Sequence, residues 1–379
     1  MDEAPLLGER LTALRNLHGL SQGALAAELG VSQPFLSLVE RSERVFGEDL
    51  ALAAGQRFDL PRSFFSVEPG STEAAPVTFR KKASAGVRVE ARVVQTFKEA
   101  ARLFALVSER SGYRAADLPD AEDLSNDPAQ CAEEVRSRLG IERNAAIPNV
   151  VRALERAGVG VLVGLDPHRS PTGDHVSLSR PADARGRPLV AVVATCPGAV
   201  QRMSVAHELG HLILDRARLR QIAGTRSPEE KRAYVFAAAL LLPDVVIERQ
   251  VSESLTLHGY LRIKAEYGMS VAAIVMRARD LGLISAARAR SLQIQMSSQG
   301  WRTDEPVKIP AEQSMLFEQA VTRVFGDRSA RDIATAVGTD PALVAHWLHR
   351  RDDAATSAPV ISLSERRARV QPQRVSRQG

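Results

Sequence analysis

Two histidines four residues apart, with a glutamate beside the first, constrain this chain more than any other feature. His207, Glu208 and His211 lie in an apolar run from Met203 to Ile213, which favours a buried helix. Residues four apart share one helix face, so both imidazoles can turn a nitrogen to a single ion. Glu208, one step round, can take a proton from a water at that ion. The pattern predicts a zinc site of metallopeptidase type, with His207 and His211 as ligands and Glu208 as general base.

A second helix is predicted to bring the third ligand. Ser227 has the character of an N-cap, Pro228 opens the helix and Pro243 stops it. A catalytic zinc takes three protein ligands and keeps one open position. Glu230 is the first choice for the third ligand, and Glu229 is the second. Ser227 and Glu230 also have capping-box spacing, in which Glu230 would only bond to the start of its own helix. Both interpretations stay open.

Residues 7–65 show the spacing of a helix-turn-helix. Ser21 and Ser32 are placed as N-caps of two short helices, and Gly30 supplies the turn between them. That arrangement lets the second helix project into the major groove of DNA. The positions expected at the interface include base-facing, phosphate-reaching and capping residues. Gln33, Pro34 and Ser37 would face bases, Gln22, Arg41 and Arg44 would reach phosphates, and Ser32 would lie at the helix start.

Three strand-like runs precede the histidine pair, at 158–164, 174–179 and 189–196. Their short connections favour antiparallel pairing over parallel crossovers. The last of them leads into the predicted metal-site helix, and we expect it to be the sheet edge along which a substrate lies. Before them, residues 66–76 are rich in Pro, Gly and Ser and are predicted to be a linker.

The overall composition excludes several classes of protein. Hydrophobic residues make up 44% of the chain and charged residues 25%, which is ordinary for a folded globular protein. Two cysteines cannot build a disulfide framework. The chain begins with no signal-like segment and has no uninterrupted apolar run of membrane-spanning length, so we expect a cytoplasmic protein with no membrane partner. A net charge of +5 is only weak evidence for an anionic partner.

Two stretches resemble known families. GLSQGALAAELGVSQPFLSLVERSER resembles the phage-repressor (XRE) family of helix-turn-helix regulators. HELGHLIL followed by ExxAxxFAAxLLxP resembles the ImmA/IrrE-type metallopeptidases, gluzincin-like enzymes often fused to XRE modules. Phe79-Arg80-Lys81-Lys82 agrees with the same family, and the resemblance spans about residues 7 to 302. It implies zinc held by His207, His211 and Glu230, with Glu208 as base.

This chain departs from each family pattern at one place. Val45-Phe46-Gly47 stands where XRE proteins usually have a polar, Pro-containing turn, and Arg232-Ala233-Tyr234 stands where the metallopeptidases commonly show Glu-Ala-Asn. His258 and Tyr260 are further candidates, as donors to a tetrahedral oxyanion. A surface histidine and a packing tyrosine are the alternative interpretation of that pair.

The expected fold class is α+β and mostly helical. It combines an N-terminal all-α helix-turn-helix domain, a zincin-like domain with a small, mainly antiparallel sheet, and a helical C-terminal region. Residues 303–351 carry a second helix-turn-helix-like pattern that is either a DNA-binding unit or a packing or dimer element. The expected division is a DNA-binding domain at 1–65, a linker at 66–76, a metallopeptidase-like domain at 77–302, a helical element at 303–351 and a disordered basic tail at 352–379.

Three hypotheses for the function follow. In the first, a DNA-binding regulator bound to operator DNA as a homodimer uses its zinc centre to cleave a repressor or another protein partner in response to a signal. In the second, the zinc-binding domain is a ligand or stress sensor without proteolysis. In the third, the chain is a toxin–antitoxin or phage-immunity component that works by protein contact.

Overall fold

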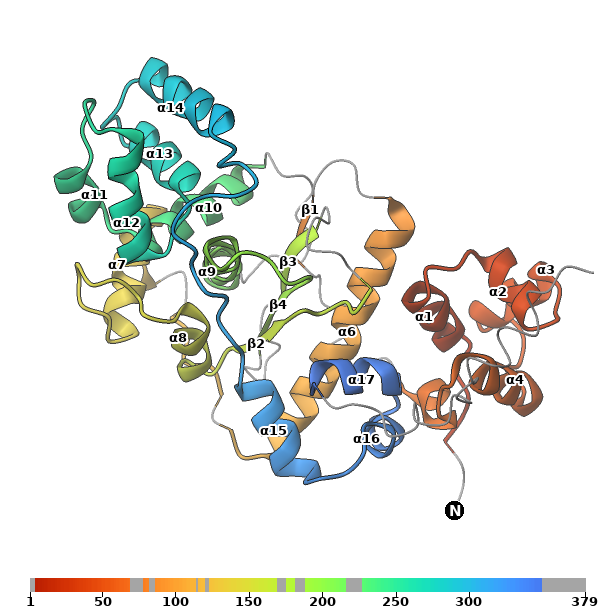
Figure 1. Ribbon diagram of the computed structural model, residues 1–379. Helices are drawn as coiled ribbons and strands as arrows, with labels where there is room; N and C mark the ends of the chain where they lie inside the picture. The colour runs from red at the N-terminus through yellow and green to blue at the C-terminus, as the bar shows by residue number, and fades with distance from the viewer. Residues whose placement is uncertain are drawn as a thin grey trace, which may run out of the picture.

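The computed structural model describes residues 4–68, 78–81, 86–113, 115–119, 123–168, 175–180, 188–215 and 227–349. Most of the predicted linker and the whole predicted basic tail lie outside these residues. Within them, no helix is long and apolar enough to cross a membrane. Helices dominate and a small sheet lies at the centre (Figure 1), which confirms the expected α+β, mostly helical fold class.

The elements follow the local signals in the sequence closely. Ser21 and Ser32 accept hydrogen bonds from Ala24 N and Phe35 N as N-caps, and Gly30 has a positive φ of 66°. The helices are α1 (Glu9–Leu17), α2 (Gln22–Glu28), α3 (Gln33–Glu40), α4 (Glu48–Phe58), η1 (Arg62–Ser66), α6 (Val87–Arg110), α7 (Pro128–Arg138), α8 (Val150–Arg156), α9 (Gly198–Leu214), α10 (Pro228–Leu241), α11 (Asp244–Gln250), η3 (Leu257–Gly259), α12 (Tyr260–Tyr267), α13 (Val271–Asp280), α14 (Ala286–Ser298), α15 (Leu316–Phe325), α16 (Ala330–Val337) and α17 (Pro341–Trp347).

The sheet contains four described strands in the order β1-β3-β4-β2. The strands are β1 (Thr78–Lys81), β2 (Gly160–Val163), β3 (His175–Arg180) and β4 (Leu189–Val192). β1 pairs with β3, and β3 with β4, in antiparallel fashion, whereas β2 runs parallel to β4.

Two of the three strand pairings are antiparallel, as expected, but the pairing of β2 and the position of β4 differ from the expectation. The strand that follows β2 in the sequence, β3, is not its neighbour in the sheet. The neighbour of β2 is β4, and the two strands run parallel. For the same reason the run at 189–196 is not a sheet edge, since β4 has a partner on each side. The edges of the described sheet are β1 and β2.

The two faces of the sheet belong to different cores. On one face Leu162, Leu189 and Ala191 join the core formed by α6, α15–α17 and the N-terminal helices. On the other face the neighbouring valines, Val161 and Val190 among them, pack with α9 and the helices α7 to α14. This is the period-2 alternation of a strand covered on both sides. Figure 1 shows α6 and α9 on opposite sides of the strands.

The C-terminal helices belong to the first of these cores. In α17, Leu343, Val344 and Trp347 are buried, and the Trp347 indole donates to the Leu165 carbonyl oxygen at 2.9 Å. The turn before α17 packs against η1, where a Cβ on Gly338 would meet the Ser63 oxygen at 2.6 Å. The apolar face of this second helix-turn-helix-like pattern is therefore used for packing within the chain.

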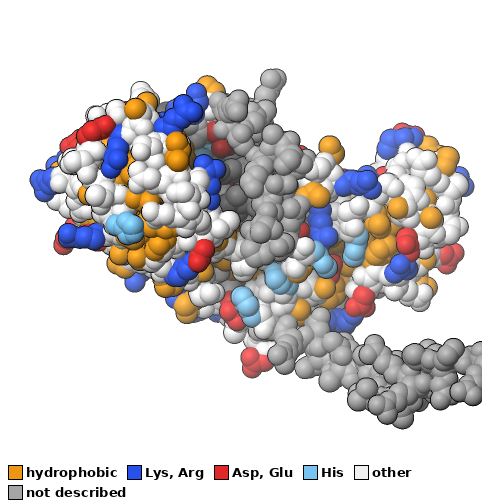
Figure 2. All heavy atoms as spheres, turned by 45° about the horizontal axis from the view of Figure 1, so that its top comes forward, with side chains coloured by type: hydrophobic (Ala, Val, Ile, Leu, Met, Phe, Trp, Pro, Cys, Tyr) orange, Lys and Arg blue, Asp and Glu red, His pale blue; other side chains and the backbone are white. Residues whose placement is uncertain are grey.

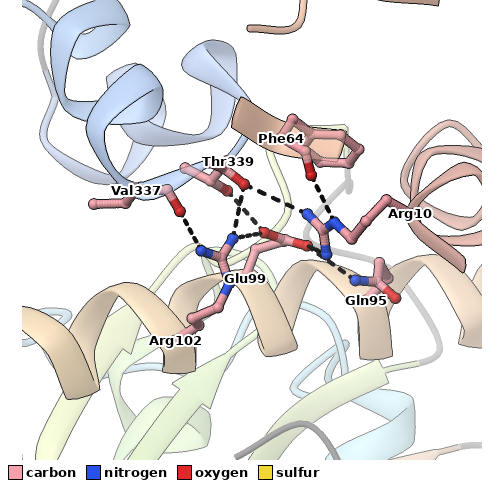
Figure 3. Close-up of polar contacts among 8 residues, drawn as sticks. Arg10, Phe64, Gln95, Glu99, Arg102, Val337 and Thr339 are labelled. Carbon is pink, nitrogen blue, oxygen red and sulfur yellow. Dashed lines mark hydrogen bonds and ion pairs between the residues drawn. The ribbon is translucent and has the colours of Figure 1, made fainter. Parts of the chain in front are cut away.

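A buried carboxylate joins the N-terminal helices to this assembly. Glu99 of α6 has no solvent exposure, and its Oε1 accepts hydrogen bonds from Arg10 of α1 and Gln95 of α6, both at 3.0 Å. Its Oε2 accepts from the Thr339 hydroxyl at 3.0 Å and pairs with Arg102. The four partners converge on one carboxylate from three parts of the chain (Figure 3).

The two arginines extend this cluster to the backbone. Arg10 Nε donates to the Phe64 carbonyl oxygen at 2.8 Å, and its guanidinium lies 4.2 Å from the Phe64 ring centroid. Arg102 donates to the Gly338 carbonyl oxygen at 3.0 Å. Burial by itself raises the pKa of Glu99, but the adjacent Arg10 and Arg102 outweigh it and hold that pKa at about 2. We call Glu99, Arg10, Gln95, Arg102 and Thr339 the Glu99 cluster.

We predict that Glu99→Ala lowers the free energy of unfolding by about 3–5 kcal/mol, because the change leaves the buried Arg10 and the half-buried Arg102 without their counter-charge. The measurement is denaturant unfolding followed by circular dichroism at pH 7. Glu318→Ala, an exposed glutamate on α15, is the matched control and should leave the midpoint unchanged.

The same variant has a defined pH signature. The folded-state pKa of Glu99 is about 2, below its ordinary value of 4.5, so its contribution is full above pH 4.5 and is lost as the pH falls toward 2. The stability difference between wild type and Glu99→Ala should therefore shrink across that window. A loss no larger than that of the Glu318 control at pH 7 would contradict the role of the cluster.

Candidate metal centre

The helix α9 carries the histidine pair through the middle of the second core. His207 and His211 are each 1% exposed and Glu208 is fully buried. Gly210 lets α10 approach closely, since a Cβ there would lie 3.0 Å from the Phe236 ring and 3.2 Å from the Ala233 Cα. A small residue at this position therefore lets the start of α10 come close to the two histidines.

Glu230, in the first turn of α10, faces the histidine pair. Its Oε2 lies 3.3 Å from His207 Nε2 and its Oε1 lies 3.4 Å from His211 Nε2, while the two Nε2 atoms are 3.1 Å apart. Ser227 accepts a hydrogen bond from Glu230 N at 3.3 Å. The backbone N–H of Glu230 takes part in the helix cap, while its carboxylate points to the two histidines. Glu230 can therefore serve the cap and face the metal position at the same time.

These three side chains fit a zinc ion. With metal–ligand distances of about 2.0–2.1 Å and a tetrahedral angle, ligand atoms lie about 3.3 Å apart. The two Nε2 atoms are 3.1 Å apart, and each lies 3.3–3.4 Å from a different carboxylate oxygen of Glu230. One ligand atom from each of the three residues lies within 4.8 Å of the other two, which is close enough for a single ion to draw them together. Two imidazole nitrogens and one carboxylate oxygen are also a donor set that zinc accepts in hydrolytic sites. Among the described residues, His207, His211 and Glu230 form the group able to hold a metal ion, and Glu229 does not belong to it.

Glu208 is held beside this group by the sheet. The Ser177 hydroxyl of β3 donates to Glu208 Oε1 at 2.7 Å. The other oxygen, Oε2, is buried and has no hydrogen-bond partner among the described residues. A buried carboxylate oxygen without a partner is costly unless a ligand or water meets it. This is the arrangement expected of a base that faces a reacting water.

Asp215 and Arg232 support His211 from behind, a contact that the sequence analysis did not identify. Asp215 Oδ2 lies 2.7 Å from His211 Nδ1, and Asp215 Oδ1 accepts from Arg232 at 2.6 Å. A carboxylate on the far nitrogen of a ligand histidine fixes its tautomer and ring orientation. The spacing of four residues between His211 and Asp215 was the available signal. Arg232, the departure from the family pattern, neutralises this carboxylate.

The metal-free site is a strongly coupled acid–base group. Burial by itself lowers the pKa of His211, but hydrogen bonds to Asp215 and Glu230 outweigh it and raise that pKa to about 9. Burial by itself raises the pKa of Glu230, but its contacts with both histidines hold that pKa at about 2. At neutral pH the metal-free site therefore carries a proton on His211, and a metal ion must displace that proton.

The two proposed oxyanion donors occupy different surroundings. His258 is exposed on η3, and its ring meets the Trp301 ring edge-to-face at 5.4 Å. Tyr260 is fully buried in the second core. The Tyr260 hydroxyl is buried and has no hydrogen-bond partner among the described residues. The exposure of His258 agrees with the alternative interpretation of a surface histidine.

Most of the positions expected to meet DNA are accessible to solvent. Ser32, Gln33, Pro34, Arg41 and Arg44 are exposed. Gln22 and Ser37 are half-buried. Figure 2 shows Lys and Arg side chains on the outer surface of the lobe that these helices form.

A hydrogen-bond chain that the sequence did not reveal orients the start of α3. Arg15 Nε donates to Glu40 Oε1 at 3.1 Å, and Gln22 donates to Glu40 Oε2 at 2.7 Å. Gln33 then donates to Gln22 Oε1 at 3.0 Å. Glu40 thus fixes Gln22, and Gln22 fixes Gln33 at the exposed helix end. Because these residues are 11 and 18 positions apart, no local pattern predicts them.

The two arginines that follow α3, Arg41 and Arg44, contact side chains of their own domain. Arg41 pairs with Glu43 at 2.7 Å and donates to the Ser37 hydroxyl at 2.9 Å. The Arg44 guanidinium lies 4.8 Å from the Phe35 ring centroid. Both side chains are exposed, and exposed ion pairs are worth little, so a phosphate can replace Glu43 at small cost.

Comparison with known families covers both parts of the chain. Residues 11–65 match the family model described as helix-turn-helix, and residues 159–279 match the one described as the IrrE N-terminal-like domain, a peptidase family. The first range holds α2 and α3, and the second holds the metal-capable triad. No curated protein matches the chain. These two matches confirm the resemblances found in the sequence.

We predict that the purified chain binds one zinc ion and that His207→Ala abolishes this binding, because two remaining ligands cannot close a tetrahedral site. Metal content by mass spectrometry and titration with a chromophoric chelator measure the effect. His258→Ala, the exposed histidine, is the matched control and should bind zinc as the wild type does.

The proton on His211 adds a pH dependence to this prediction. Because the pKa of His211 is about 9 in the metal-free site, each zinc ion bound near neutrality releases that proton. The apparent zinc affinity should rise by about tenfold per pH unit between pH ~6 and ~8. A wild-type chain that takes up no zinc across this range would exclude the metal centre.

Proposed function

We propose that this chain, which joins an XRE-type helix-turn-helix domain to an IrrE-like domain of metallopeptidase fold, is a DNA-binding regulator that hydrolyses a peptide bond in a protein partner. One observation carries the catalytic part of the proposal. The buried Oε2 of Glu208 lies without a hydrogen-bond partner among the described residues, on the same helix as two histidines of a metal-capable triad.

The roles of the residues follow from their positions. Zinc, when held by His207, His211 and Glu230, supplies Lewis-acid activation of a water and of the scissile carbonyl. Glu208 takes a proton from the attacking water as the new carbon–oxygen bond forms. It then gives a proton to the amine nitrogen as the carbon–nitrogen bond breaks. Asp215, through its 2.7 Å contact with Nδ1, keeps Nε2 of His211 directed at the ligand position.

The pairing of Ser177 with Glu208 supports the role of a base. The hydroxyl occupies Oε1 at 2.7 Å, which leaves Oε2 as the oxygen that can meet water. The carboxylate is fully buried, and in a site of low polarity a proton transfer is not weakened by competing solvent. The Ser177 hydroxyl therefore acts as a positioning group for Glu208.

The DNA-binding part of the proposal rests on the start of α3. Gln33 is exposed there, and the chain through Gln22 and Glu40 fixes its orientation. A fixed amide at the N-terminal end of a recognition helix suits contact with an adenine edge in the major groove. Operators read by such modules are usually two-fold, so we propose that two copies of the chain bind one operator.

We predict that Glu208→Gln lowers peptide hydrolysis by at least about 100-fold while zinc content stays at the wild-type level, because the amide cannot accept the proton from water. The measurement is hydrolysis of a pool of unstructured peptides by the zinc-loaded full chain, read by mass spectrometry. Glu229→Gln, one residue away from the triad member Glu230, is the matched control.

The same variants separate the proposal from a sensor without proteolysis. A regulator that needs cleavage loses its effect on transcription in Glu208→Gln. A sensor keeps its effect in Glu208→Gln and loses it in His207→Ala, because only the metal is then required. That second pattern, together with no hydrolysis by the wild-type chain, would refute the catalytic part.

We predict that Gln33→Ala weakens binding to a DNA site selected from a random pool by about 1–3 kcal/mol, because one bidentate base contact is lost. Electrophoretic mobility shift or fluorescence anisotropy with the full chain measures the change. Gln56→Ala, an exposed glutamine on α4 in the same domain, is the matched control. Equal binding by both variants would show that α3 does not read the site.

A further inference from the structure

The strand nearest to the candidate base is β3. It packs against α9, and its Ser177 hydroxyl holds Glu208. A peptide that is to be cut beside Glu208 must lie in extended form next to this strand. Extended peptides commonly bind by adding a strand to a sheet edge, where main-chain hydrogen bonds supply affinity. Of the two edges of β3, one is taken by β4.

The chain itself takes the other edge. β1 runs antiparallel to β3, with Arg80 as the register partner of Ser177 and Phe79 as that of Leu178. Residues 78–81 therefore lie alongside the very position from which β3 contacts the base. The register shifts between Arg80 and Lys81, so the regular ladder covers only a few residues.

We propose that the β1-side edge of β3 is the peptide-binding edge of the metal centre, and that β1 occupies it as an intramolecular competitor of the substrate. The proposal rests on the proposed function, because it concerns the same metal centre. The ligand class is an unstructured protein segment that can adopt an extended strand. β1 must leave the edge before such a segment can bind.

The position of β1 in the chain makes it an effective competitor. It lies between η1, which ends at Ser66, and α6, which begins at Val87. Both flanking elements are fixed to each other, since Arg10 bonds to the Phe64 carbonyl oxygen and to Glu99. A segment that is tethered to its site within one chain has an effective concentration on the order of millimolar.

The pairing of β1 is also short enough to be reversible. Four residues form the strand, fewer than the usual length of five or six. Because β1 has a partner strand on one side only among the described strands, its opening breaks a single short ladder. A partner segment that pairs over more residues of β3 can therefore displace β1, whereas a weakly pairing peptide cannot.

The test measures peptide binding, which needs no hydrolysis. The probe is a fluorescent peptide with the sequence of residues 77–82, Val-Thr-Phe-Arg-Lys-Lys, titrated with the full chain by anisotropy. Phe79→Pro with Arg80→Pro removes two adjacent backbone N–H groups and so breaks β1 pairing in either register phase. We expect this double variant to bind the probe about tenfold or more tightly than wild type.

Two controls keep the result interpretable. Phe79→Ala with Arg80→Ala keeps both backbone N–H groups, so its probe affinity should stay near that of the wild type. A scrambled hexapeptide should bind the proline variant less well than the probe does. Unchanged binding to operator DNA shows that the proline variant retains its fold.

A disulfide that holds β1 on β3, which we call the lock, tests the opposite expectation. Phe79→Cys with Leu178→Cys, at register-paired positions, made in a Cys196→Ser background, should bind no probe when oxidised and should regain binding on reduction. Equal probe affinity of the wild type and the proline variant, or probe binding by the oxidised lock, would overturn the proposal. If the proline variant gains binding but no variant hydrolyses peptide, the catalytic proposal fails and the peptide edge remains.

Discussion

A fully buried carboxylate between two arginines is the interaction on which the arrangement of this molecule depends. Glu99 has no access to water, and a buried charge is tolerated only where partners compensate it. Those partners come from α1, from α6 itself and from the turn before α17. Removing α1 would take away one of the two arginines, and removing the turn would take away the Thr339 hydroxyl and the carbonyl oxygen that accepts from Arg102. The DNA-binding helices, the central helix and the C-terminal helices are therefore expected to fold as one cooperative unit.

The sheet connects this buried cluster to the candidate metal centre. One of its faces packs in the core that contains α6, and the other packs against α9. The strand β3 contributes Ser177 to the α9 side, where it holds Glu208. The position of Glu208 therefore depends on this sheet. The opposite face of the sheet packs in the core that also contains the N-terminal helices. The helix-turn-helix and the candidate metal centre therefore belong to one packed scaffold.

What could be predicted from the sequence is what local chemistry determines. Ser21 and Ser32 cap their helices as expected, because a cap needs only the next three residues. His207 and His211 meet because four residues make one helix turn. The contact of Arg10 with Glu99 joins positions 89 residues apart, and no periodicity encodes such a distance. The place of β4 inside the sheet was missed for the same reason, since strand order is a property of the whole chain.

The two helix-turn-helix-like patterns show how packing decides between similar sequences. Both have a capped helix, a turn and a second helix, with Ser32 before α3 and Asp340 before α17 as N-caps. In α3 the first residues after the cap, Gln33 and Pro34, remain exposed. In α17 the corresponding stretch is largely buried, and Trp347 is bonded to the loop after β2. Both helices bury one face in the same core, but only α3 leaves its first turn exposed, which is the part of a recognition helix that contacts bases.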